Sequence, residues 1–94
     1  MTLKEAQELI EAWNEKNSVK NSELTTIALL TEELGRLARV IAQTHGEHGP
    51  AKNEAISREI GNTMWALIGV ANQTNTDLTI SLINALEDKS TQKR

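Results

Sequence analysis

The chain has 94 residues, enough for one domain, and its 13 acidic and 10 basic residues give a formal net charge of -3, without the basic surplus of a nucleic-acid-binding surface. Apolar residues make up 38% of the chain and charged residues 24%, a balance that favours a folded domain over a disordered segment. Cysteine is absent, which excludes a disulfide framework, a thiolate zinc site and a cysteine nucleophile, and favours a reducing, cytoplasmic location.

The chain carries no segment that predicts membrane insertion. Its longest apolar run, residues 64–71, is far shorter than the roughly 20 residues that span a bilayer. The first residues include the charged Lys4 and Glu5, where a signal peptide would need an unbroken apolar stretch. We therefore expect neither a membrane nor a nucleic acid as a partner.

Capping residues and apolar spacing predict the first two helices. Thr2 and Glu5 have the spacing of a capping box, and apolar residues then recur at steps of three and four, which predicts a helix over residues 3–16. A polar break follows. From Glu23 to about Thr44 the spacing predicts a long helix packed lengthwise against its neighbours. The apolar residues of that seam are Ile27, Leu30, Leu34, Leu37 and Ile41.

A loop and two further helices complete the chain. Residues 45–50 contain the only Pro, two Gly and both His, which predicts a loop. A third helix is predicted over residues 53–73, and a fourth begins after the turn at 75–77, with residues 89–94 as a polar tail. Four helices joined by short loops predict an all-α fold, an antiparallel four-helix bundle.

A single domain of residues 1–94 is small, and such a domain buries only about 60 to 65% of the surface that its unfolded chain exposes. Its two aromatic residues, Trp13 and Trp65, lie on apolar helical faces and are expected to belong to the core. Dimerisation is a further expected source of stability, because the long apolar seams exceed what so small a chain can cover by itself.

Two pairs of polar residues are the candidates for chemistry. Glu33 and Arg36 are three residues apart in the second predicted helix, and Glu59 and Asn62 are three apart in the third, so each pair shares a helical face. Two facing helices could bring the pairs together. A solvated or salt-bridged helix face is the simplest interpretation of such pairs taken alone.

The sequence around these pairs resembles the MazG-like nucleotide pyrophosphohydrolases, all-α proteins with the signature Glu-Glu-x-x-Glu followed by Glu-x-x-Asp. The corresponding segments here are Thr-Glu-Glu-Leu-Gly-Arg-Leu-Ala at 31–38 and Arg-Glu-Ile-Gly-Asn-Thr-Met-Trp at 58–65. The resemblance continues through Ala-Asn at 71–72 and Asp-Leu at 77–78, so it covers nearly the whole chain. It implies a MazG-like helical domain that assembles into a homodimer or homotetramer.

The resemblance also implies a magnesium-dependent hydrolysis. In that family the second and third Glu of the first motif, with the Glu and Asp of the second, hold Mg²⁺ beside a nucleoside triphosphate. Water attacks the phosphorus next to the sugar, and nucleoside monophosphate and pyrophosphate are released. Mg²⁺ needs oxygen ligands, and it neutralises phosphate charge while it activates the water. The motifs make Glu32, Glu33 and Glu59 the catalytic candidates, and Glu33, Glu59 and Asn62 the candidate metal ligands.

Two of the four ligand positions depart from the family pattern, because Arg36 replaces the third Glu and Asn62 replaces the Asp. An Asn carbonyl can still bind Mg²⁺ weakly, whereas a guanidinium group has donors only. The formal charge of the four positions rises from -4 to -1. Arg36 is therefore expected to pair with Glu33 or Glu59 in place of an ion, or else to contact phosphate.

These departures predict a nucleoside triphosphate pyrophosphohydrolase whose activity is weak or absent. The alternative is a non-catalytic module for helical dimerisation or nucleotide binding on the same scaffold. Asn72 and Asp77 resemble family positions near the nucleotide, although hydrogen bonding at helix ends or capping explains them equally well.

Overall fold

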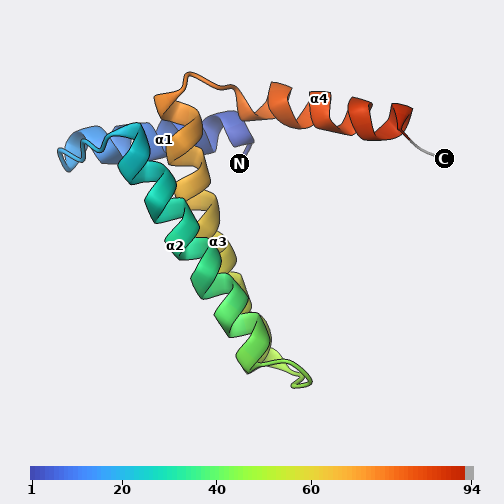
Figure 1. Ribbon diagram of the computed structural model, residues 1–94. Helices are drawn as coiled ribbons and strands as arrows, with labels where there is room; N and C mark the ends of the chain where they lie inside the picture. Colours follow the sequence, from blue (N-terminus) through green and yellow to red (C-terminus); the bar gives the residue numbers. More distant parts are fainter. Residues whose placement is uncertain (93–94) are drawn as a thin grey trace.

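The computed structural model describes residues 1–92, and its four helices occupy the predicted segments, with differences at two boundaries (Figure 1). They are α1 (Leu3–Lys16), α2 (Glu23–Gln43), α3 (Pro50–Gln73) and α4 (Leu78–Thr91). No strand occurs within the described residues, so the all-α prediction is confirmed. Within the same residues, no helix combines the length and the hydropathy needed to cross a membrane.

Local capping explains why the helices start where they do. At α1, the backbone N–H of Thr2 donates to the Glu5 carboxylate at 2.8 Å, and the backbone N–H of Glu5 donates to the Thr2 hydroxyl at 3.0 Å, which completes the predicted capping box. At α4, Asp77 Oδ1 accepts from the Ile80 backbone N–H at 3.1 Å. The predicted starts of both helices are therefore fixed by side chains that satisfy free backbone donors.

Two predicted boundaries shift. α3 begins at Pro50, three residues before the prediction, because proline is well suited to the first turn of a helix. The preceding Gly49 has φ +112°, a conformation that favours glycine. α4 continues to Thr91, so residues 89–91 of the expected polar tail are helical, whereas residues 93–94 of that tail lie outside the described residues.

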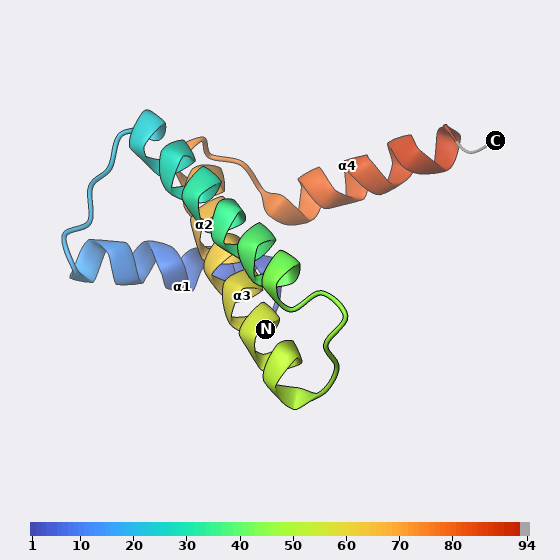
Figure 2. The same cartoon turned by 60° about the horizontal axis from the view of Figure 1, so that its bottom comes forward.

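α2 and α3 form a long antiparallel hairpin (Figure 2). The buried and half-buried residues of α2 are Thr26, Leu30, Glu33, Leu37 and Val40, and those of α3 along the same seam include Lys52, Ile56, Glu59, Thr63, Ala66 and Val70. Their alternating steps of three and four are typical of two helices packed lengthwise. Glu33 and Glu59 therefore occupy positions in the seam that are usually apolar.

The seam of α2 has a different register from the predicted one. Leu30 and Leu37 face α3 as expected, but Ile27, Leu34 and Ile41 remain 45%, 54% and 46% exposed. Thr26 and Glu33 take the neighbouring seam positions instead. Three of the five residues of the predicted apolar stripe are thus left uncovered within the chain.

α1 crosses α3, and Gln7 joins it to the start of α4. The Gln7 side-chain amide donates to Asn72 Oδ1 at 3.1 Å and to the Thr76 carbonyl at 2.8 Å, and its oxygen accepts from the Leu78 backbone N–H at 3.0 Å. The Asn72 amide donates in turn to the Gln7 carbonyl at 3.1 Å. One half-buried residue therefore fixes both the α1–α3 crossing and the direction in which α4 leaves.

We expect Gln7→Met, which keeps the size of the side chain and removes its polar atoms, to lower the free energy of unfolding by about 2 kcal/mol, because partly buried groups at Thr76 and Leu78 lose their hydrogen bonds. Urea unfolding monitored by circular dichroism measures the change. Gln43→Met, at an exposed position of α2, is the matched control and should stay within about 0.5 kcal/mol of the parent. Equal effects from both variants would contradict the assigned role of Gln7.

The chain is more open than a compact monomer. Its radius of gyration is 15.6 Å, compared with about 12.4 Å for a compact domain of this length. The buried apolar residues within the described part of the chain are Ile10, Ile68 and Ala71. α4 extends away from the α2–α3 hairpin and has α1 as its main neighbour (Figure 1).

Candidate active site

A cleft of about 520 Å³ lies between α1, the connection over residues 17–22, and the α2–α3 hairpin. Side chains from all four segments line it, and most of its polar lining consists of amides. The lining residues are Glu11, Trp13, Asn14, Val19, Lys20, Asn21, Thr26, Leu29, Glu33, Asn62, Trp65, Ala66, Gly69, Asn72 and Gln73. A concave site with aromatic walls and a few polar groups is typical of small-molecule binding.

The two tryptophans form one wall of this cleft. Trp13 of α1 and Trp65 of α3 meet edge to face, with ring centroids 5.3 Å apart and an interplanar angle of 87°. They remain 48% and 43% exposed. The prediction that both belong to the core is therefore wrong, because the open angle between α1 and the hairpin leaves a large part of each ring accessible to a ligand.

Two carboxylate oxygens in the α2–α3 seam lack partners. Among the described residues, Glu33 Oε2 and Glu59 Oε2 are buried and have no hydrogen-bond partner. A buried acceptor without a partner is costly, and in a native structure it calls for an explanation such as a bound water, an ion or a ligand donor. The predicted pair Glu33 and Glu59 thus has free acceptor capacity at the seam.

Arg36 pairs with two glutamates of its own helix. Its Nη1 lies 2.9 Å from Glu33 Oε1, and its Nη2 lies 2.5 Å from Glu32 Oε1. The guanidinium side chain is 50% exposed, so the pairs stabilise the fold only modestly. Their effect on chemistry is larger, because Arg36 occupies one oxygen of Glu33 and holds a positive charge beside the free one.

The other predicted site residues divide between the cleft and its surroundings. Asn62 and Asn72 line the cleft together with Glu33, whereas Glu32, Glu59 and Asp77 are outside its described lining. The Asn72 side chain is partly engaged by Gln7, because its Oδ1 accepts from the Gln7 amide and its Nδ2 donates to the Gln7 carbonyl. Asp77 caps α4, which is the structural interpretation that its position at a helix start allows.

Sequence reasoning gave no role to Lys20 or Gln73, which also line the cleft. Gln73 donates to the Asn21 carbonyl at 2.6 Å, while its Oε1 is buried and without a hydrogen-bond partner among the described residues. No motif marks either position. Gln73 ends α3 and Lys20 lies in a connection, so only the folded arrangement brings them to the cleft.

These residues do not fit the magnesium site that the family motif implies. Arg36 has no acceptor atoms, and it occupies one oxygen of Glu33. The remaining oxygen ligands are Glu33 Oε2, the Glu59 carboxylate and the weaker carbonyl of Asn62. Within residues 1–92, no group of three or more His, Cys, Asp or Glu is arranged to hold a metal ion.

The structure defines an all-α protein with a helical hairpin, two glutamates in its seam and an adjoining cleft, and the comparisons with known proteins identify the family. The model of the MazG nucleotide pyrophosphohydrolase domain matches residues 21–93, and the chain belongs to this family. The match leaves out α1, so the cleft wall at Trp13 lies outside the matched residues.

One solved structure is similar over almost its whole length. It is the crystal structure of the Bacillus-conserved MazG protein, described as a nucleotide pyrophosphohydrolase, with a TM-score of 0.84 and 28% sequence identity. The alignment covers 100% of this chain and 95% of that chain, so it includes α1 and α4. No curated protein matches the chain.

Proposed function

We propose that this chain binds a nucleotide in the cleft beside the α2–α3 hairpin and hydrolyses it to nucleoside monophosphate and pyrophosphate weakly or not at all. Family membership and the similarity to a nucleotide pyrophosphohydrolase support the substrate class. We infer low activity from Arg36, which stands where the family motif has a carboxylate. Its guanidinium group is bound by Glu32 and Glu33.

The cleft suits the base and the sugar of a nucleotide. Trp13 and Trp65 present partly exposed rings, and stacking of one base on an aromatic ring contributes about 1 to 3 kcal/mol. The amides of Asn14, Asn62 and Asn72 line the same space, and an amide offers both donors and an acceptor to the edge of a base or to a sugar hydroxyl. Binding of the base and the sugar needs no metal ion.

The charged residues that line the cleft are less suited to binding the phosphates of a nucleotide. The charged residues among the described lining are Glu11, Glu33 and Lys20, which sum to a formal charge of -1. A triphosphate is strongly anionic and is bound best by cations or by several donors. Lys20 offers a single positive charge, and the charge of Arg36 is already compensated by two carboxylates.

Catalysis is limited by the same lack of positive charge. The free oxygens of Glu33 and Glu59 can accept hydrogen bonds from a water molecule and orient it. Hydrolysis also requires stabilisation of the charge that develops on the phosphate oxygens. Arg36 is held by Glu32 and Glu33. Glu33 and Glu59 would therefore orient a water molecule without a cation that stabilises the phosphate charge, and turnover is slow or absent.

Nucleotide binding is tested by isothermal titration calorimetry with a panel of nucleoside mono- and triphosphates. We expect binding that weakens by about tenfold or more in Trp65→Ala, because one stacking partner is lost, and that recovers in Trp65→Phe, which retains an aromatic ring. With Mg²⁺ present, the triphosphate should bind no more than about tenfold tighter than the monophosphate of the same base, a difference of about 1.4 kcal/mol.

Two results would contradict this account. Absence of binding for the whole panel would reject the cleft as a nucleotide site and leave the non-catalytic helical module as the remaining interpretation. A strong, Mg²⁺-dependent preference for the triphosphate would show that the parent already holds a working metal site.

A further inference from the structure

One end of the cleft contains a buried acceptor that lacks a donor. Gln73 ends α3 and lines the cleft. Its Nε2 donates to the Asn21 carbonyl at 2.6 Å, whereas its Oε1 is buried and has no hydrogen-bond partner within residues 1–92. A buried acceptor without a partner costs free energy, so a ligand that donates to this oxygen is bound in preference to one that does not.

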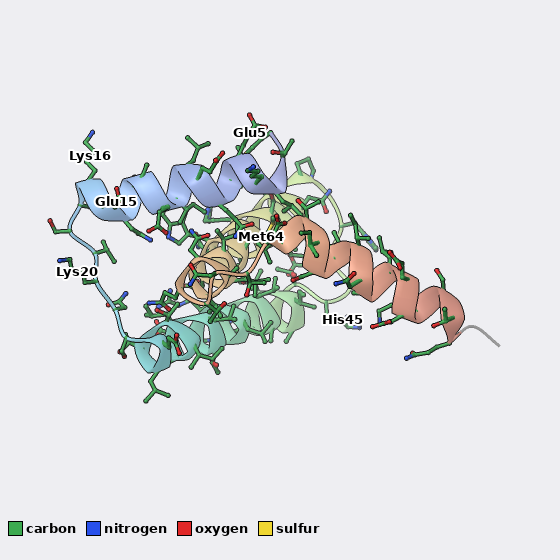
Figure 3. The ribbon with its side chains drawn as sticks, turned by 90° about the horizontal axis from the view of Figure 1, so that it is seen from above. Glu5, Glu15, Lys16, Lys20, His45 and Met64 are labelled. Carbon is green, nitrogen blue, oxygen red and sulfur yellow. The ribbon has the colours of Figure 1, made fainter. Side chains whose placement is uncertain are left out.

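The connection over residues 17–22 fixes which atom of the Gln73 amide is free. If the amide turned over, its oxygen would face the Asn21 carbonyl, and two acceptors would repel each other. Figure 3 shows this connection from above, with Lys20 labelled, between the end of α1 and the start of α2. Gln73 therefore offers an acceptor that rotation of its amide cannot exchange for a donor.

The free acceptor lies at the end of the cleft that is far from the seam glutamates. The residues of α3 that line the cleft share one face, at steps of three and four, and are Asn62, Trp65, Ala66, Gly69, Asn72 and Gln73. Asn62, which lines the cleft with Glu33, is eleven residues from Gln73, or about 16 Å along the helix. Trp65 lies between these two ends. A base stacked on Trp65, with its phosphates toward Glu33, therefore turns its far edge toward Gln73.

The bases differ in what that edge offers to an acceptor. Cytosine and adenine carry an amino group there, which donates, whereas thymine and uracil carry the carbonyl oxygen O4, which accepts. Hypoxanthine, the deaminated form of adenine, likewise has a carbonyl in place of the amino group. An amino group gives Gln73 Oε1 the donor that it lacks, while a carbonyl places two acceptors against each other. Lys20 is exposed, so its donors remain solvated with either kind of base.

We propose that Gln73 makes the cleft selective for nucleotides whose base carries an amino group at its far edge, cytosine or adenine, over their deaminated counterparts with uracil or hypoxanthine. Oε1 is buried in this structure, and a small shift of the connection over residues 17–22, which belongs to no helix, brings it into contact with the amino group. The proposal rests on the proposed function, because it assigns the base that the same cleft binds.

Isothermal titration calorimetry with two matched pairs of nucleoside monophosphates tests the preference. CMP and UMP, like AMP and IMP, differ at this edge by an amino group in place of a carbonyl. We expect CMP and AMP to bind the parent at least about tenfold tighter than UMP and IMP. Equal affinities within both pairs, or a preference for UMP and IMP, would overturn the selectivity and leave nucleotide binding intact. Absence of binding by all four nucleotides would reject the proposed function together with it.

Gln73→Met assigns the preference to Gln73, because it keeps the length of the side chain and removes its acceptor. The ratio of affinities within each pair should fall to about one, through weaker binding of CMP and AMP. Loss of the bond to Asn21 weakens all four nucleotides alike and leaves the ratio unchanged, so the ratio separates recognition from structure. Gln43→Met, at an exposed position of α2, is the control and should keep the parent ratio. Circular dichroism confirms the folding of both variants. A parent-like ratio in folded Gln73→Met would overturn the role of Gln73.

Discussion

The double substitution Arg36→Glu with Asn62→Asp should convert this chain into a protein that a divalent metal ion stabilises. The parent ion pairs of Arg36 with Glu32 and Glu33 are lost, and the formal charge of Glu33, Glu59 and positions 36 and 62 falls from -1 to -4. Without metal these carboxylates repel one another, so the variant should unfold at a lower temperature than the parent.

Metal should reverse that order. An ion that binds only the native state stabilises it by about 2.7 kcal/mol at one hundred times its dissociation constant, which corresponds to a rise of roughly 10 to 20 °C in melting temperature for a chain of this length. The buried free oxygens of Glu33 and Glu59 are available as ligands in both proteins, but only the variant adds two further carboxylates to them.

The measurement is a thermal melt of both proteins across a titration with Mg²⁺ and with Mn²⁺, at one fixed protein concentration because self-association also affects melting. Arg36→Gln is the control, since it removes the guanidinium group without adding a carboxylate and should respond little to metal. If the parent gains as much from the metal as the double variant, then Arg36 and Asn62 have not disabled the site.

Local signals in the sequence predict the helices well. The capping box at Thr2 and the cap at Asp77 each act over three residues, so their outcome depends little on the rest of the fold. The register of the α2 seam cannot be predicted from such local signals. Two adjacent stripes, one through Leu30 and the other through Leu34, are apolar, and spacing alone does not tell which one meets α3.

The candidate site is predictable to the extent that it lies on single helices. Arg36 and Glu33 are three residues apart, so their ion pair follows from helical geometry alone. The cleft depends on how α1 crosses α3, which no local pattern encodes. For that reason the sequence predicts Trp13 and Trp65 as core residues and gives no role to Lys20, although the structure places all three at the cleft.

The open shape of the chain also explains why so few apolar residues are buried. The sequence supplies apolar residues on both sides of the α2–α3 hairpin and along α4, more than the contacts within one chain use. An expectation of dimerisation follows from the size of the domain, whereas the identity of the uncovered apolar stripe follows only from the structure, because it requires knowing which stripe of α2 is occupied by α3.

Hydrolysis by the parent and the double variant tests the central claim most directly. Each protein is incubated with a panel of nucleoside triphosphates and with Mg²⁺ or Mn²⁺, and nucleoside monophosphate and pyrophosphate are measured over time. A bound metal ion stabilises the transition state by several kcal/mol, and each 1.36 kcal/mol is a factor of ten in rate. We therefore expect the variant to turn over about a hundredfold faster than a slow or inactive parent.

Arg36→Gln, run beside them, should remain as slow as the parent, which separates the gain of ligands from the loss of the guanidinium group. We expect monophosphate and pyrophosphate in equal amounts from the double variant and little or none from the parent. Steady, metal-dependent release of both products by the parent, at a rate that the two substitutions do not raise, would contradict it.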